Sequence, residues 1–92
     1  MIQNYFDRYY IEARLRARGF HYTQRGEWVS KGTNFVIRVS RSSVSLRAYK
    51  WPLSGLLFET SLSYEEALEF FLEMKYGDAL EYLRATGHIR VR

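Results

Sequence analysis

The sequence predicts an α+β fold with an N-terminal helix, an antiparallel four- to five-stranded meander, and one or two C-terminal helices packed on one face of the sheet. Three observations predict it. Apolar residues near the N-terminus have helical spacing, residues 20–60 form short alternating segments separated by turn residues, and a helix-capping pattern follows. Because 92 residues are the length of one domain, we expect residues 1–92 to form a single compact domain.

The first helix is expected from about Asn4 to Arg18, with Gly19 as its C-terminal stop. Its predicted core stripe, extended by Phe20, consists of apolar residues at three-to-four spacing: Ile2, Phe6, Tyr9, Ala13 and Ala17. A second, smaller apolar patch of Ile11 and Leu15 lies beside two arginines. We interpret that flank as a candidate contact site, with Arg14 and Arg18 as its cations.

The middle of the chain is expected to form hairpin-connected strands at about Phe20–Gln24, Glu27–Lys31, Asn34–Val39, Val44–Tyr49 and Leu56–Thr60. The alternation in two of these strands assigns their faces. Phe35, Ile37, Val39, Val44, Leu46 and Ala48 are expected to face the helices, and the opposite face to carry Val36, Arg38, Ser45, Arg47 and Tyr49.

The C-terminal part is expected to be helical. Ser63 and Glu66 have the spacing of a capping box, and the helix that they start continues to Lys75. Gly77 is expected to interrupt it and Asp78 to cap a second helix. That helix is predicted at about Ala79–Ala85, ended by Gly87, with an apolar face of Leu80, Tyr82 and Leu83. Residues 88–92 are expected to be a short edge strand or a basic tail.

The charge is divided along the chain. Residues 1–50 contain ten cations and three anions, whereas residues 51–88 contain two cations and seven anions. Eleven of the fourteen basic residues are Arg, whose planar guanidinium suits phosphates, carboxylates and aromatic faces. The division indicates either an anionic partner for the basic half or mutual neutralisation of the two halves, within one chain or in a homodimer.

Several kinds of chemistry have no support in the sequence. The absence of Cys excludes disulfides, thiolate catalysis and cysteine zinc sites. We find no nucleotide-binding, metalloprotease or serine-hydrolase motif, so no cofactor or metal is implied. There is no signal-peptide pattern and no apolar run long enough for a membrane span, so a cytoplasmic protein without membrane association is expected.

The strongest functional candidate is the outer sheet face, where Arg side chains can pair with phosphates and aromatic rings can stack on bases. Its expected contact residues are Arg38, Arg47 and Tyr49, with Arg41 and Trp51 beside them. The structural alternative is an ordinary solvated face, as antiparallel sheets commonly have. The acidic stripe of Glu65, Glu69 and Glu73 is likewise either solvated or paired with cations.

The leading hypothesis is therefore a small non-catalytic module that binds nucleic acid or an acidic protein surface through Arg and Tyr. The main alternative is a small protein-binding inhibitor or adaptor, of the kind that phages and mobile elements encode, with Tyr, Trp and Arg as interface anchors. A small ribonuclease is third, because His21 or His88 could act as a general acid or base beside Arg, Tyr or Glu.

Overall fold

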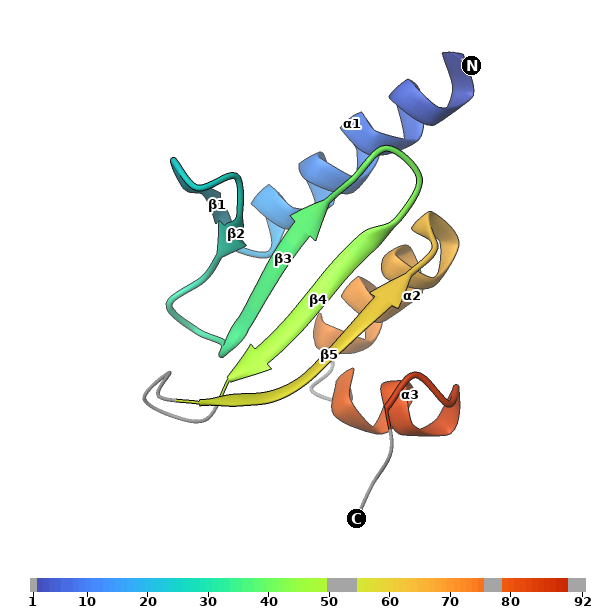
Figure 1. The fold of residues 1–92 in the computed structure, drawn as a ribbon. Coiled ribbons are helices and arrows are strands. Elements are labelled where there is room, and N and C mark those ends of the chain that lie inside the picture. The colour runs from blue at the N-terminus through green and yellow to red at the C-terminus, as the bar shows by residue number, and fades with distance from the viewer. Residues whose placement is uncertain (1, 50–54, 76–78, 90–92) are drawn as a thin grey trace.

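A computed structural model describes residues 2–49, 55–75 and 79–89, apart from the side chains of residues 2–7 and 75. Within these ranges it contains three helices and one five-stranded sheet, which confirms the predicted α+β class (Figure 1). The elements are α1 (Ile2–Ala17), β1 (His21–Tyr22), β2 (Trp28–Val29), β3 (Phe35–Val39), β4 (Val44–Tyr49), β5 (Leu56–Leu62), α2 (Tyr64–Lys75) and α3 (Ala79–Ala85).

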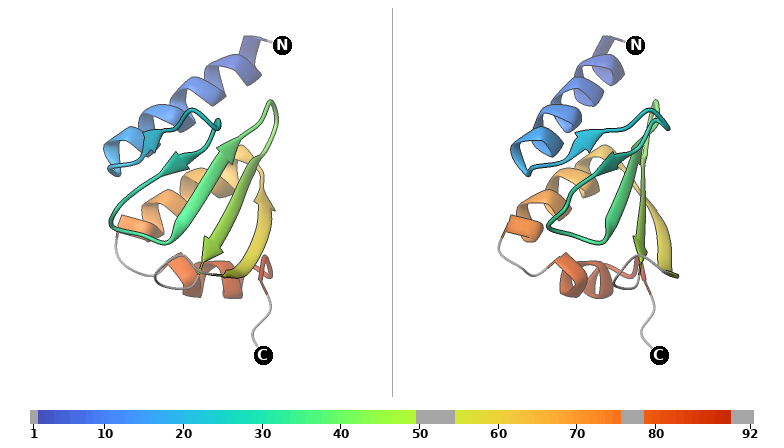
Figure 2. Two further views of the ribbon diagram at one scale, coloured as in Figure 1. Left: turned by 60° about the vertical axis from the view of Figure 1, so that its left-hand side comes forward. Right: turned by 90° about the vertical axis from the view of Figure 1, so that its left-hand side faces the viewer.

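The sheet is an antiparallel meander in the order β1-β2-β3-β4-β5. Helices α1 and α2 lie side by side against one of its faces and run in the same direction, while α3 packs against α2 at one end of the layer (Figure 2). No other described element covers the opposite face of the sheet. The molecule therefore has a helical face and an open sheet face on opposite sides.

In β3 and β4, buried and outward-facing side chains alternate as the sequence predicts. Val44, Leu46 and Ala48 are buried against the helices, and Ser45, Arg47 and Tyr49 point to the open face. On the neighbouring strand, Ile37 and Val39 are buried, Phe35 is half-buried in the same core, and Arg38 is exposed. Because alternate side chains of a strand point to opposite faces, the buried set determines which residues reach the open face.

The core stripe predicted for α1 was wrong at Tyr9, Ala13 and Ala17, whereas Phe20, which was predicted to extend it, is buried. Ile11 and Leu15, interpreted from the sequence as a surface patch, have no exposed area, whereas the Tyr9 side chain is 63% exposed and Ala13 and Ala17 are exposed. The physical reason is size. Burial of Ile or Leu removes more apolar area from water than burial of Ala, so the helix is oriented with Ile11 and Leu15 inside. Predicted stripe members Ile2 and Phe6 lie outside the described side chains.

The start of α2 and the ends of α1 and α3 have the capping residues that the sequence predicts. The Ser63 side-chain oxygen accepts a hydrogen bond from the Glu66 backbone N–H at 3.1 Å, and Glu66 Oε1 accepts one from the Ser63 N–H at 2.8 Å, which confirms the capping box. Gly19 and Gly87 follow α1 and α3 with φ of 88° and 78°, the left-handed conformation that ends many helices. No described helix has the length and apolar character needed to cross a membrane.

The apolar face of α3 was only partly predicted. Leu83 is fully buried and Tyr82 is half-buried, but Leu80 is 42% exposed, and Ala79 takes the inward position instead. On a seven-residue helix, Ala79 and Leu83 are four residues apart and share a face, whereas Leu80 lies about 100° away from Ala79. Gly77, Asp78 and residues 90–92 lie outside the described residues.

Candidate binding surfaces

The open sheet face contains a shallow hollow of about 260 Å³. It is lined by Arg25, Glu27, Val36, Arg47 and Tyr49. Arg25 lies in the turn before β2 and is exposed, while β4 supplies Arg47 and Tyr49. The Arg47 guanidinium carbon is 5.9 Å from the centre of the Tyr49 ring, so a cation and an aromatic face occupy the same hollow.

A carboxylate that the sequence reasoning missed organises this face. The pairing of Trp28 with Ile37 places both side chains in the core, so the preceding Glu27 points outward beside β3. Glu27 Oε2 accepts hydrogen bonds from Nη2 of Arg38, at 3.2 Å, and from Nη2 of Arg47. Two guanidinium groups thus share one carboxylate. The strand register that produces this cluster was the missing information.

The remaining charges leave the open face positive. Arg25 forms no ion pair with any residue that the structure describes, and the Arg38 side chain is 54% exposed. Glu59 of β5 lies opposite Arg47 in the strand register and is exposed, without an ion pair among the described residues. The three cations around the hollow therefore exceed the two anions beside it.

Of the two other residues of the predicted sheet site, Arg41 and Trp51, neither is among the described residues that line this hollow. Arg41 is exposed in the turn between β3 and β4, and its backbone carbonyl accepts a hydrogen bond from the Tyr64 hydroxyl at 2.9 Å. It lies in the turn, apart from the residues that line the hollow. Trp51 lies outside the described residues.

The predicted helix flank borders a separate groove of about 140 Å³ between α1 and α2. Arg14 Nη2 donates a hydrogen bond to the Tyr10 hydroxyl at 3.1 Å, and Arg18 Nε donates one to the Phe71 carbonyl at 3.1 Å. Arg18, which follows the end of α1, therefore links that end to α2 and is half-buried. The groove is lined by Tyr10, Arg14, Arg18, Leu68, Phe71 and Leu72.

Glu69 of the acidic stripe, and Glu66 beside the stripe, contact the α3 end of the molecule and not these arginines. Tyr82 of α3 donates its hydroxyl to Glu69 Oε2 at 2.8 Å, and Glu66 contacts His88 beyond α3. Within the described part of the chain, no ion pair joins an arginine of α1 to a carboxylate of α2. The two halves of the sequence thus remain electrically distinct on the surface.

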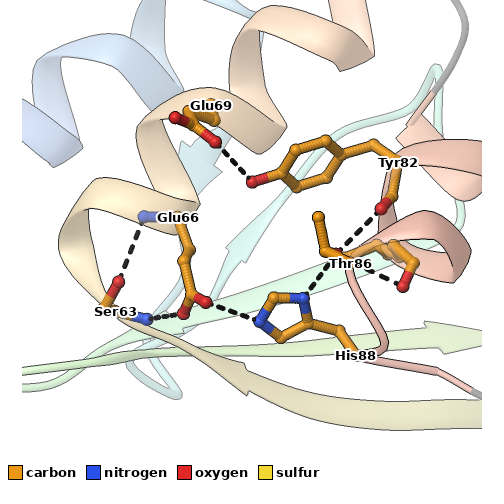
Figure 3. A network of polar contacts seen from close by, with 7 residues as sticks. Ser63, Glu66, Glu69, Tyr82, Thr86 and His88 are labelled. Carbon is orange, nitrogen blue, oxygen red and sulfur yellow. Dashed lines mark hydrogen bonds and ion pairs between the residues drawn. The ribbon is translucent and has the colours of Figure 1, made fainter.

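His88 belongs to a polar network that joins the start of α2 to the end of α3 (Figure 3). Its Nε2 lies 2.9 Å from Glu66 Oε2, and its Nδ1 lies 2.6 Å from the Thr86 side-chain oxygen. Thr86 Oγ1 also lies 2.8 Å from the Tyr82 carbonyl. Both ring nitrogens therefore have hydrogen-bonding partners, and this arrangement suits a structural role that holds α3 against α2. His21 is exposed on β1, at the far edge of the sheet.

The ionisation of two groups in this network is perturbed. Hydrogen bonds from the Ser63 backbone and side chain, and the nearby His88, lower the pKa of Glu66 against a smaller opposing effect of burial. Burial, followed by the hydrogen bond to Glu69, raises the pKa of Tyr82 to about 12. In the described ranges, no group of three or more His, Asp or Glu side chains is arranged to hold a metal ion.

Comparison of the chain with protein-family models, with curated proteins and with solved structures yields no match. The assignment of function therefore depends on the two surfaces described above.

Proposed function

We propose that this protein is a small non-catalytic module that binds nucleic acid through the open face of its sheet. The observation that carries the proposal is the hollow lined by Arg25, Arg47 and Tyr49, in which the Arg47 guanidinium lies beside the Tyr49 ring. Guanidinium groups pair with phosphate oxygens, and an aromatic face supports stacking of an unpaired base. A single-stranded segment can offer both groups at once, so single-stranded RNA or DNA is the favoured ligand.

The carboxylate of Glu27 is compatible with this role. It holds the guanidinium groups of Arg38 and Arg47 near each other before any ligand arrives. Since one carboxylate cannot neutralise two cations, a phosphate retains an attraction to the pair, which Arg25 strengthens from the turn.

Fluorescence anisotropy with labelled single- and double-stranded oligonucleotides would test the proposal. We expect binding at low salt. The logarithm of the association constant should fall linearly with the logarithm of the salt concentration, and the steepness of this line is the salt slope. Arg25→Ala combined with Arg47→Ala should weaken binding by about 10-fold or more and reduce the salt slope by roughly 1–2. Arg84→Ala is the matched control, because Arg84 is an exposed arginine on α3 whose ion pair with Glu81 is local.

Two results would refute this function. One is the absence of binding to every oligonucleotide at about 50 mM salt, where electrostatic binding is strong. The other is an equal loss of affinity in the Arg84→Ala control, which would indicate only general charge attraction. Cleavage of RNA by the purified protein, lost in His88→Ala although the fold is retained, would instead favour the ribonuclease alternative.

A second candidate function, protein binding in the manner of an inhibitor or adaptor, is favoured by the helical face. Tyr10 and Leu72 are each about half exposed there, at 48% and 50%, beside the arginines of the α1–α2 groove. Tyr, Arg and apolar anchors around a groove are typical of protein interfaces. A pull-down from nuclease-treated host lysate would test it, with Leu72→Ala as the variant that should lose a stoichiometric partner.

A further inference from the structure

The helical face combines exposed apolar side chains with separated charges. Tyr9 and Tyr10 of α1 and Leu72 of α2 are among the large hydrophobic side chains that the described chain leaves exposed. Tyr10 and Leu72 line the groove between the two helices, and Tyr9 precedes Tyr10 on α1. Such a cluster on a small protein commonly marks an interaction surface.

An exposed cation of α1 and an exposed anion of α2 lie beside this groove. α1 contributes Arg14, which is exposed and whose described partner is the Tyr10 of its own helix. α2 contributes Glu65, which is exposed and stands three residues before Leu68 and seven before Leu72, so it shares their face of the helix. Arg14 of α1 and Glu65 of α2 therefore flank the groove on opposite sides, and the two helices run in the same direction (Figure 1).

We propose that this face binds a second copy of the chain, forming a two-fold symmetric dimer in which α1 of each copy lies against α2 of the other. This proposal specifies the partner for the second candidate function and is independent of nucleic-acid binding by the sheet. A two-fold axis parallel to the groove brings Arg14 of one copy toward Glu65 of the other copy, and the same contact recurs by symmetry. Leu72 and Tyr10 then form the apolar centre.

The charge pattern selects this arrangement over the other symmetric one. A two-fold axis across the groove would place α1 against α1, so the two Arg14 side chains would approach each other. It would also place α2 against α2, so the two Glu65 side chains would approach each other. Like charges in contact across an interface are strongly unfavourable. Complementarity therefore requires the axis along the groove.

Light scattering coupled to size exclusion, and sedimentation over a concentration series, would test the dimer. We expect a mass that rises toward twice the 11.0 kDa of one chain. Arg14→Glu alone and Glu65→Arg alone should each raise the dissociation constant by about 10-fold or more, while Arg84→Glu on α3 should not change it. Circular dichroism would establish that each variant retains the fold.

Charge exchange provides the sharpest test of the geometry. The double variant Arg14→Glu with Glu65→Arg should dimerise again, and a mixture of the two single variants should form heterodimers. If α1 met α1 instead, Arg14→Glu would form heterodimers with the wild-type chain, and this result would overturn the proposed arrangement.

A chain that remains a monomer at every concentration would overturn the dimer itself, whatever other protein the face binds. Failure of the dimer and failure of nucleic-acid binding are distinguishable. The reversed charges lie on the helical face, whereas anisotropy with short oligonucleotides reports on Arg25 and Arg47 on the sheet face.

Discussion

Replacement of Glu27 by Gln separates the structural role of this carboxylate from its effect on binding. The Glu27 side chain is 16% exposed and accepts hydrogen bonds from Arg38 and Arg47. Glutamine keeps the shape but removes the charge, so both guanidinium groups lose their anionic partner. We expect a less stable protein that binds nucleic acid more tightly.

The loss of stability follows from the environment of the pair. Buried hydrogen bonds to charged groups contribute about 1.5–3 kcal/mol and exposed ion pairs about 0–1 kcal/mol. Arg47 is mostly covered and Arg38 is more than half exposed, so an intermediate loss of about 1–2 kcal/mol in the free energy of unfolding is expected. For a domain of this size, that corresponds to a melting temperature lower by roughly 5–10 °C.

The gain in affinity follows from counterion release. If the freed guanidinium neutralises one more phosphate of a single strand, the salt slope increases by about 0.7. If the variant and the wild type bind equally at about 1 M salt, the same relation predicts that the variant binds about 8-fold more tightly than the wild type at about 50 mM salt. At about 150 mM salt the difference is about 4-fold. Anisotropy titrations at several salt concentrations, with thermal melts of the same samples, would measure both effects.

Glu59→Gln is the matched control for this prediction. It makes the same change in net charge on the same sheet face, but Glu59 holds neither arginine in the described structure. It should leave stability nearly unchanged and raise affinity less. Unchanged or weaker binding by Glu27→Gln would refute the reasoning, and an equal gain in Glu59→Gln would show that general electrostatics, and not released donors, cause the effect.

The other stability predictions concern α1 and the polar network. Leu15→Ala should lower the free energy of unfolding by about 2–5 kcal/mol and Tyr9→Ala by at most about 0.5 kcal/mol, measured by chemical denaturation; the reverse order would contradict the assignment of the buried face. Because the pKa of Glu66 is lowered in the folded state, its contribution to stability should be present above the ordinary value of 4.5 and decline as the pH falls below it, and Glu66→Gln should remove this acid dependence. Because the pKa of Tyr82 is raised from 10.0 to about 12, its contribution should be complete below pH 10 and decline as the pH rises toward 12. Ultraviolet titration should show a late phenol that is absent in Tyr82→Phe.

The sequence was sufficient for those features that depend on local spacing. Strict alternation identified the open-face residues Arg47 and Tyr49, and the capping box identified the start of α2. It was insufficient where two stripes of similar spacing competed on α1. There, counting apolar residues favoured the stripe with Ala13 and Ala17, whereas the free energy of burial favours the stripe with the larger aliphatic side chains.

The candidate site was predicted in part for a related reason. Arg38 and Arg47 could be placed on one face from their own strands, but their shared contact with Glu27 depends on the register between β2 and β3. β2 has two residues, too few for alternation to reveal its pairing. The groove between α1 and α2 depends on the packing of distant segments, and exposed Leu72 alone gave no indication of it.

If both proposals hold, the two surfaces should cooperate on long ligands. A dimer formed through the helical faces places the two open sheet faces on opposite outer sides, since each sheet face is opposite its own helical face (Figure 2). A long strand that wraps the dimer can then engage both hollows, and the second contact becomes intramolecular. Leu72→Ala, which changes no charge and lies away from both hollows, should weaken binding to long single strands by about 10-fold or more but leave short oligonucleotides unaffected. Equal binding of long and short strands by the wild-type dimer would show instead that the two sheet faces act independently.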